Sequence, residues 1–85
     1  MPSVEQEIRQ FILDNFLFGE VERSPSSEDS LLERGIVDST GVLELVAFLE
    51  KKFGIEILEN ELVPSNLDSL NKLVDFVARK TAVST

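Results

Sequence analysis

The sequence contains no cysteine, no histidine, no tryptophan and no tyrosine. Without cysteine the chain can form neither a disulfide nor a thiolate nucleophile, and the usual zinc sites are excluded. Without histidine it cannot assemble a Ser-His-Asp set, which argues against a hydrolase of that kind. We therefore expect a protein that is not an enzyme, with no catalytic residue and no metal site. Its only aromatic residues are six phenylalanines, so the core should be mainly aliphatic.

Basic residues are also scarce. Eight lysines and arginines stand against sixteen aspartates and glutamates, which gives a net charge of −8. No nucleic-acid partner is expected, because neutralising phosphates requires clusters of basic residues that are absent here. The expected partners are proteins with basic surfaces, which such a field would attract.

Long apolar runs are missing as well. No run approaches the roughly 18–20 residues that are needed to span a bilayer, and the N-terminus lacks the pattern of a signal peptide. We therefore expect a cytoplasmic protein without a membrane span. Eighty-five residues suffice for one domain with a modest core. We expect a monomer with a single domain at 1–85, an ordered core at about 3–80 and a frayed tail at 81–85.

Hydrophobic periodicity predicts helices, and no β pattern competes with it. Ser3 and Gln6 can form a capping box at the start of a first helix, which should end near Leu17 or Phe18, before Gly19. Its apolar stripe repeats at helical spacing and comprises Val4, Ile8, Phe11, Ile12 and Phe16. A polar loop follows over residues 20–30. The residues expected to anchor it to the core are Leu31, Leu32, Ile36 and Val37.

A second helix is predicted from about Ser39 to Phe53, with Gly54 as a left-handed C-cap. Its apolar stripe comprises Val42, Leu45, Val46, Leu49 and Phe53. Brief turns are expected at 59–63 and near 65–67, and Ser69 should cap a last helix. The stripe of that helix comprises Leu70, Leu73, Val74 and Val77. The expected fold is all-α, a small bundle of three main helices with one or two short ones.

Ser39 holds a particular position at the start of the second predicted helix. Asp38 is a suitable N-cap, because its carboxylate can accept hydrogen bonds from the free N–H groups of the first turn. Ser39 then becomes the first helical residue, beside the positive end of the helix dipole. An anionic phosphate attached there would be favoured electrostatically.

Asp-Ser occurs three times in the chain, so the dipeptide alone does not select a serine. Asp29-Ser30 lies only a few residues before Gly35, which should stop any helix, and Asp68-Ser69 caps the last helix. Only Ser39 begins a long helix that also has a patterned outer face.

That outer face is composed of Thr40, Leu43, Glu44, Ala47 and Lys51, with Glu50 alongside. A small apolar patch of Leu43 and Ala47, rimmed by carboxylates and next to a modifiable hydroxyl, is typical of a docking surface. From periodicity alone another interpretation is more common. In that interpretation Ser39 merely starts the helix and the acidic face is solvated.

Three strings narrow the choice: LLERGIVDS at 31–39, GVLELVAFLE at 41–50 and FGIEI at 53–57. Together with LVP at 62–64 and LDSL at 67–70, they closely resemble acyl carrier proteins. The resemblance covers nearly the whole chain, with the serine motif, the acidic second helix and the flanking helices in register.

The resemblance implies a function. In this family the serine that corresponds to Ser39, next to Asp38, carries 4′-phosphopantetheine transferred from coenzyme A, which makes the modified chain a phosphoprotein. The arm holds acyl or aminoacyl groups as thioesters for lipid or secondary-metabolite biosynthesis. The implied partners are a phosphopantetheinyl transferase and acyl- or aminoacyl-activating ligases or synthases. The residues implied in partner binding are Thr40, Leu43, Glu44, Ala47 and Glu50.

Two departures from the family pattern indicate a specialised member. Thr40 stands where the family usually has Leu, Met or Ile directly after the serine. Lys51 and Lys52 stand where fatty-acid carriers tend to continue with acidic residues. Both changes favour a stand-alone carrier that serves a dedicated ligase or a small pathway.

Two other functions compete with a carrier. One is an unmodified acidic helical adaptor that binds partners through Leu43, Ala47 and the surrounding carboxylates. The other is a switch in which Ser39 is phosphorylated at the helix start. Coenzyme A distinguishes the three, since only a carrier accepts a pantetheine arm.

Overall fold

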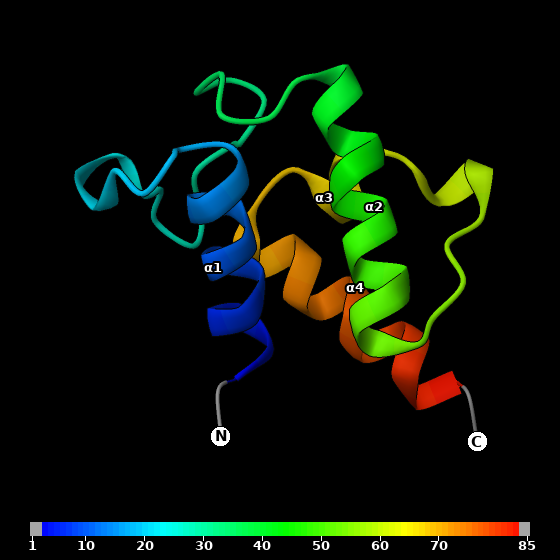
Figure 1. The fold of residues 1–85 in the computed structure, drawn as a ribbon. Helices are drawn as coiled ribbons and strands as arrows, with labels where there is room; N and C mark the ends of the chain where they lie inside the picture. The colour runs from blue at the N-terminus through cyan, green and yellow to red at the C-terminus, as the bar shows by residue number, and fades with distance from the viewer. Residues whose placement is uncertain (1–2, 84–85) are drawn as a thin grey trace.

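The computed structural model describes residues 3–83 and confirms the all-α prediction. Three main helices, α1 (Val4–Asn15), α2 (Ser39–Phe53) and α4 (Leu70–Val83), form the bundle in Figure 1. A short helix α3 (Pro64–Leu67) and two 3₁₀ turns, η1 (Val21–Arg23) and η2 (Glu59–Glu61), lie in the connections. None of the helices in this described part is long and apolar enough to cross a membrane.

The helix starts follow the sequence. Ser3 and Gln6 form the predicted capping box of α1, with each backbone N–H donating to the other's side chain. Helix α2 has the predicted bounds, Ser39–Phe53, and ends at Gly54 with a φ of +65°. The hydroxyl of Ser69 accepts a hydrogen bond from the Lys72 N–H at the start of α4. Helix α4 remains helical to Val83, past the point where we expected fraying, and residues 84–85 lie outside the described part.

Helix α1 ends at Asn15, earlier than predicted. The N–H of Leu17 donates to the Ile12 carbonyl at 3.2 Å, which turns the chain and buries the Leu17 side chain completely. Phe18 and Gly19 then both take positive φ, +52° and +83°. For a residue with a side chain the left-handed region costs about 1–2 kcal/mol.

Helix α4 lies at the centre of the bundle, packed against α1, α2 and α3. Its buried face is therefore wider than the predicted stripe. It includes Phe76, which is 2% exposed and which the periodicity missed. The buried core comprises Ile8, Ile12, Leu17, Leu31, Ile36, Val37, Leu45, Leu49, Ile57, Leu67, Leu70, Leu73, Phe76 and Val77.

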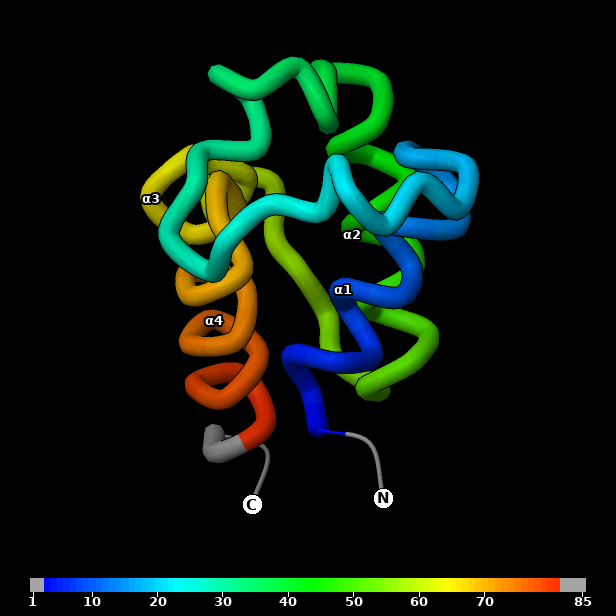
Figure 2. Tube along the Cα trace, turned by 90° about the vertical axis from the view of Figure 1, so that its left-hand side faces the viewer, coloured from blue at the N-terminus to red at the C-terminus, as the bar shows by residue number. Residues whose placement is uncertain are grey.

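The long connection between α1 and α2 is held by polar contacts. Figure 2 follows it, in cyan and teal, from the end of α1 across to α3 and back to the start of α2. The Arg9 guanidinium donates to the Ser24 hydroxyl at 2.9 Å and to the Pro25 carbonyl at 2.6 Å. Further along, the N–H of Asn71 donates to the Ser27 carbonyl at 3.0 Å. These bonds keep a polar segment in one path over the core.

The predicted anchors of this connection are correct except for Leu32. Leu31, Ile36 and Val37 are buried, whereas Leu32 is 40% exposed. The N–H of Arg34 donates to the Ser30 carbonyl, so the segment makes a single helical turn. Neighbouring residues in such a turn point in different directions. Leu31 therefore enters the core, while Leu32 remains at the surface.

An ion pair joins η2 to α4 and makes a pH-dependent contribution to stability. Lys80 Nζ lies 2.8 Å from Glu61 Oε1, and the Leu58 N–H donates to the same oxygen. The Lys80 side chain and the Leu58 N–H lower the pKa of the Glu61 carboxyl. A lowered folded-state pKa stabilises the fold above the unfolded-state pKa of about 4.3, and this contribution is lost as the pH falls through the folded value.

We therefore expect the melting temperature of Glu61→Gln to be lower than that of the parent protein at pH 7. This difference, the gap, should close as the pH falls below about 4. Melting curves of both proteins from pH 7 to pH 2.5 measure this gap. A gap that stays constant over the whole range would contradict the assignment of the ion pair as its cause.

Candidate functional site

Ser39 is the first residue of α2, as predicted, and Asp38 is its N-cap. The Asp38 carboxylate accepts a hydrogen bond from the Gly41 N–H at 2.7 Å, and its carbonyl accepts one from the Val42 N–H at 2.9 Å. The Ser39 side chain is exposed. Within residues 3–83 nothing hydrogen-bonds its hydroxyl, so this group is available for chemistry at the helix N-terminus.

The serines of the other two Asp-Ser pairs have structural roles. The Ser30 hydroxyl donates to the Asp68 carboxylate and accepts from the Glu33 N–H. Ser69 is 4% exposed, and its hydroxyl caps α4. The structure thus separates the three serines, since among these pairs only the Ser39 hydroxyl is exposed and without a partner in the described residues.

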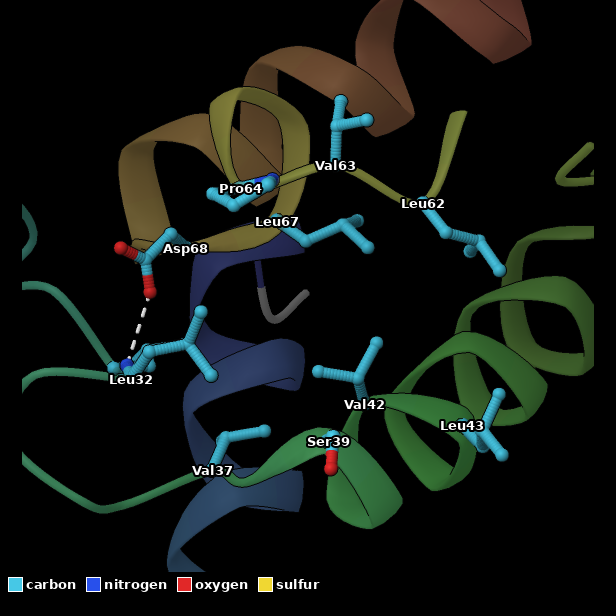
Figure 3. Close-up of a pocket in the computed structure, with 11 residues that line it drawn as sticks. Leu32, Val37, Ser39, Val42, Leu43, Leu62, Val63, Pro64, Leu67 and Asp68 are labelled. Carbon is cyan, nitrogen blue, oxygen red and sulfur yellow. Dashed lines mark hydrogen bonds between the residues drawn. The ribbon is translucent and has the colours of Figure 1, made fainter. Parts of the chain in front are cut away.

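An apolar groove of about 310 Å³ begins beside Ser39. Figure 3 shows Ser39 at its edge, with side chains from α2, from the segment before α2 and from the region of α3 around it. The residues that line it are Leu31, Leu32, Val37, Ser39, Val42, Leu43, Leu62, Val63, Pro64, Leu67 and Asp68. Periodicity did not predict this groove, because its walls come from three segments whose packing brings them together.

Asp68 holds one wall of the groove in place. Its carboxylate accepts hydrogen bonds from the Ser30 hydroxyl and, at 2.9 Å, from the Leu32 N–H, the bond drawn in Figure 3. Its carbonyl accepts a third from the Leu31 N–H at 2.9 Å. Sequence reasoning assigned Asp68 only to the start of α4. The hydrogen bonds from residues 30–32 to Asp68 could not be predicted from local sequence patterns, because the partners lie 36 to 38 residues apart.

The proposed docking face of α2 is mostly exposed. Thr40, Glu44 and Ala47 are exposed, and Leu43 is 61% exposed. Glu50 differs, because its side chain is half-buried and one carboxylate oxygen accepts the Ile57 N–H at 2.9 Å. Glu50 therefore holds the segment after α2 in position. This structural role was not predicted, because the sequence placed Glu50 only at the docking surface.

The charge around Ser39 is negative. Glu33, Asp38 and Glu44 are all exposed near the start of α2. The nearest arginine in sequence, Arg34, is paired with Asp29 at 2.7 Å. The Ser26 N–H and then Arg34 lower the pKa of the Asp29 carboxyl, so this pair stays ionised. Within residues 3–83 no group of three or more carboxylates is arranged to hold a metal ion.

Comparison with known proteins decides the family. The chain is 32% identical to the probable acyl carrier protein PigG of a Serratia species, over 93% of this chain and 90% of that protein. The chain belongs to the acyl carrier protein family. This confirms the resemblance carried by the strings around Ser39.

Other acyl carrier relatives agree. The acyl carrier protein of Buchnera aphidicola is 29% identical over 93% of this chain and 96% of its own length. The D-alanyl carrier protein of Streptococcus gordonii is 30% identical over 78% of this chain and 81% of its own. No family model matches the sequence. These relatives are all named as carriers, and they support a carrier function for this chain.

Proposed function

We propose that this protein carries acyl or aminoacyl groups as thioesters on a 4′-phosphopantetheine arm attached to Ser39, and that it is not itself an enzyme. One observation carries the proposal. The Ser39 hydroxyl is exposed and unengaged at the N-terminus of α2, whereas Ser30 and Ser69 use theirs to hold the fold. Phosphopantetheine supplies the thiol that this chain, which has no cysteine, lacks.

The start of α2 fits a phosphodiester. The first N–H groups of a helix have no partner within the helix, and its dipole places about half a positive charge there. Asp38 uses the Gly41 N–H, which leaves the earlier N–H groups of the turn for phosphate oxygens. This interaction favours an anion by about 0.3–1 kcal/mol. An arm on Ser39 would therefore add charge where the helix tolerates it.

Attachment of the arm requires an external catalyst. The Ser39 Oγ–P bond forms as the pyrophosphate P–O bond of coenzyme A breaks, the adenosine bisphosphate leaves, and the serine proton must go to a base. Asp38 holds the helix start, and the chain has no histidine. A phosphopantetheinyl transferase must therefore supply the base, and Mg²⁺ would offset the phosphate charge.

The groove beside Ser39 suits the apolar part of a carried group. Its lining is composed of aliphatic side chains, a proline, Ser39 at the edge and Asp68 in one wall. Burying apolar surface stabilises by about 25 cal/mol per Å². A carried chain that reaches this groove would be partly removed from water, and solvent access to its thioester would fall.

The exposed face of α2 is the proposed contact for the transferase and for activating ligases or synthases. Thr40, Leu43, Glu44 and Ala47 form it, and Glu50 stands at its border with one carboxylate oxygen already engaged. A partner with lysines or arginines around an apolar depression would complement this face, because charge complementarity speeds association.

We expect Glu44→Lys to lower kcat/KM for modification by a phosphopantetheinyl transferase roughly tenfold, because a charge reversal at a docking face slows association. Its melting temperature should stay close to the parent's, since an exposed helical position changes stability by only about 0.5 kcal/mol. Glu56→Lys, the same change at an exposed position after α2, is the control. Equal kinetics for both variants would remove Glu44 from the docking face.

The direct test of the carrier is intact mass after incubation with coenzyme A, Mg²⁺ and a broad-specificity phosphopantetheinyl transferase. A gain of one phosphopantetheine supports the proposal. No gain from a folded protein would favour the unmodified acidic adaptor, whose apolar contact would be Leu43, 61% exposed on α2.

A further inference from the structure

Phe18 and Val21 are the most exposed large hydrophobic side chains in the described part of the chain, at 83% and 66%. They lie three residues apart in the turn that leads from α1 to η1. Single exposed apolar residues are ordinary, but two of them within four residues of one turn concentrate exposed apolar surface there. We name Phe18 and Val21 the turn patch.

Phe18 is also held in a costly backbone conformation. Its φ of +52° makes it the one non-glycine residue with positive φ within residues 3–83. Glycine or asparagine adopts this region far more readily than a bulky aromatic residue. The backbone is fixed on both sides, by buried Leu17 and by the Gly19 N–H, which donates to the Leu13 carbonyl at 2.9 Å.

The fold gains little from a phenylalanine here. An 83% exposed ring buries almost no apolar area, so it does not repay the strain of its backbone. A residue that costs stability without packing is expected at a functional position, where a partner supplies the missing contact.

The turn patch lies within reach of an enzyme that acts on Ser39. A side chain at Gly41 would meet the Phe16 ring at 2.7 Å, so the Phe16 side chain, directly after α1, packs against the first turn of α2. The Phe16 side chain reaches from the backbone to this contact, and two residues of chain, at most about 7 Å, separate Phe16 from Phe18 and again Gly41 from Ser39. Together these lengths place Phe18 within roughly 25 Å of Ser39. A standard interface covers about 800 Å² per partner, a disc about 32 Å across, and can include both.

The charge next to the turn patch indicates the kind of partner. Glu20 lies between Phe18 and Val21 and is paired with Arg23 at 3.2 Å, whereas exposed Glu22, directly after the patch, has no ion-pair partner in the described residues. With a net charge of −8, a second copy of this chain or an anionic membrane would be repelled. A protein surface with lysines or arginines around an apolar pocket is the complementary occupant.

We propose that the turn patch is a second docking point, separate from the face of α2, through which an enzyme that acts on Ser39 holds this carrier. The partner inserts no residue into the fold; it provides an apolar pocket for Phe18 and Val21 with a basic rim that faces Glu22. This inference rests on the proposed function of Ser39.

The test measures modification kinetics and melting temperature together. The probe is a phosphopantetheinyl transferase with coenzyme A, and the variants are Phe18→Asn, Val21→Ser and, as control, Leu58→Ser. Leu58 is 49% exposed in the segment before η2. We expect Phe18→Asn to raise the KM for the carrier about tenfold, because an aromatic side chain that fills a pocket of the partner is typical of a binding hot spot. Val21→Ser should raise it less and Leu58→Ser not at all.

Stability separates docking from a structural role. Asparagine tolerates a positive φ, so Phe18→Asn should melt at or above the parent's temperature. If the parent is modified and Phe18→Asn has the same KM as the parent, the docking inference is overturned while the carrier function stays intact. A parent that is never modified would overturn the proposed function itself. Concentration-dependent dimers of the parent that Phe18→Asn abolishes would make the patch a self-association surface and overturn the enzyme-docking proposal.

Discussion

Replacement of Ser39 by alanine is expected to abolish modification by coenzyme A completely, while the parent gains one phosphopantetheine per chain. The Ser39 oxygen is the atom that would form the bond to phosphorus, and alanine has no atom to replace it. The Asp38 cap and the bounds of α2 do not depend on the Ser39 hydroxyl, which makes no hydrogen bond in the described residues. The variant should therefore fold, and intact mass measures the result.

Thr40→Ala is the matched control for this experiment; because Thr40 lies on the proposed docking face, the comparison uses the final mass after complete reaction and not the rate. Thr40 is the next exposed hydroxyl along α2, so its removal tests whether the transferase distinguishes adjacent positions. Modification of Thr40→Ala but not of Ser39→Ala would assign the arm to Ser39. Modification of Ser39→Ala would place the arm on another residue and contradict the proposed site.

Replacement of Asp68 by alanine is expected to cause the largest loss of stability among the polar positions considered. It removes the acceptor for the Ser30 hydroxyl and the Leu32 N–H. Hydrogen bonds to charged groups contribute about 1.5–3 kcal/mol each, and partial exposure of Asp68 lets water replace part of this. A net loss of about 3 kcal/mol corresponds to a melting temperature lower by roughly 12–24 °C in a domain of this size.

Thermal unfolding of Asp68→Ala, Asp68→Asn and Asp14→Ala measures this effect. Asp68→Asn keeps one acceptor oxygen, so it should lose less stability than Asp68→Ala. Asp14 is exposed and accepts one bond, from Gln10 in the preceding turn, so its removal should cost about 0.5 kcal/mol or less. A melting temperature of Asp68→Ala equal to that of Asp14→Ala would show that the loop at 30–32 does not depend on this carboxylate.

Local patterns predicted most of the helices. The Ser3–Gln6 box, the cap at Asp38 and the left-handed Gly54 each depend on residues within a few positions of one another. Errors arose where distant packing intervened. Helix α1 ends early because the core takes Leu17, and Phe76 is buried because three helices surround α4.

The candidate site was predicted only in part. Ser39 and Asp38 follow from the start of α2, and Leu43, Glu44 and Ala47 follow from its periodicity. Periodicity gave no means to distinguish Glu50, whose partner, the Ile57 N–H, lies beyond the end of the helix. The exposure of Phe18 was equally hidden, because an apolar residue at a helix end is normally read as core.

The sequence by itself determined the class of fold and the start of α2, and it limits the chemistry that we propose. A chain without cysteine or histidine offers a hydroxyl for modification but no thiol and no imidazole base, and these are properties of composition. Only the tertiary structure decided which hydroxyl is available, what forms the groove beside it and which apolar residues face outward. Those features depend on contacts between segments such as 30–32 and Asp68, far apart in the chain, whose geometry no local spacing encodes.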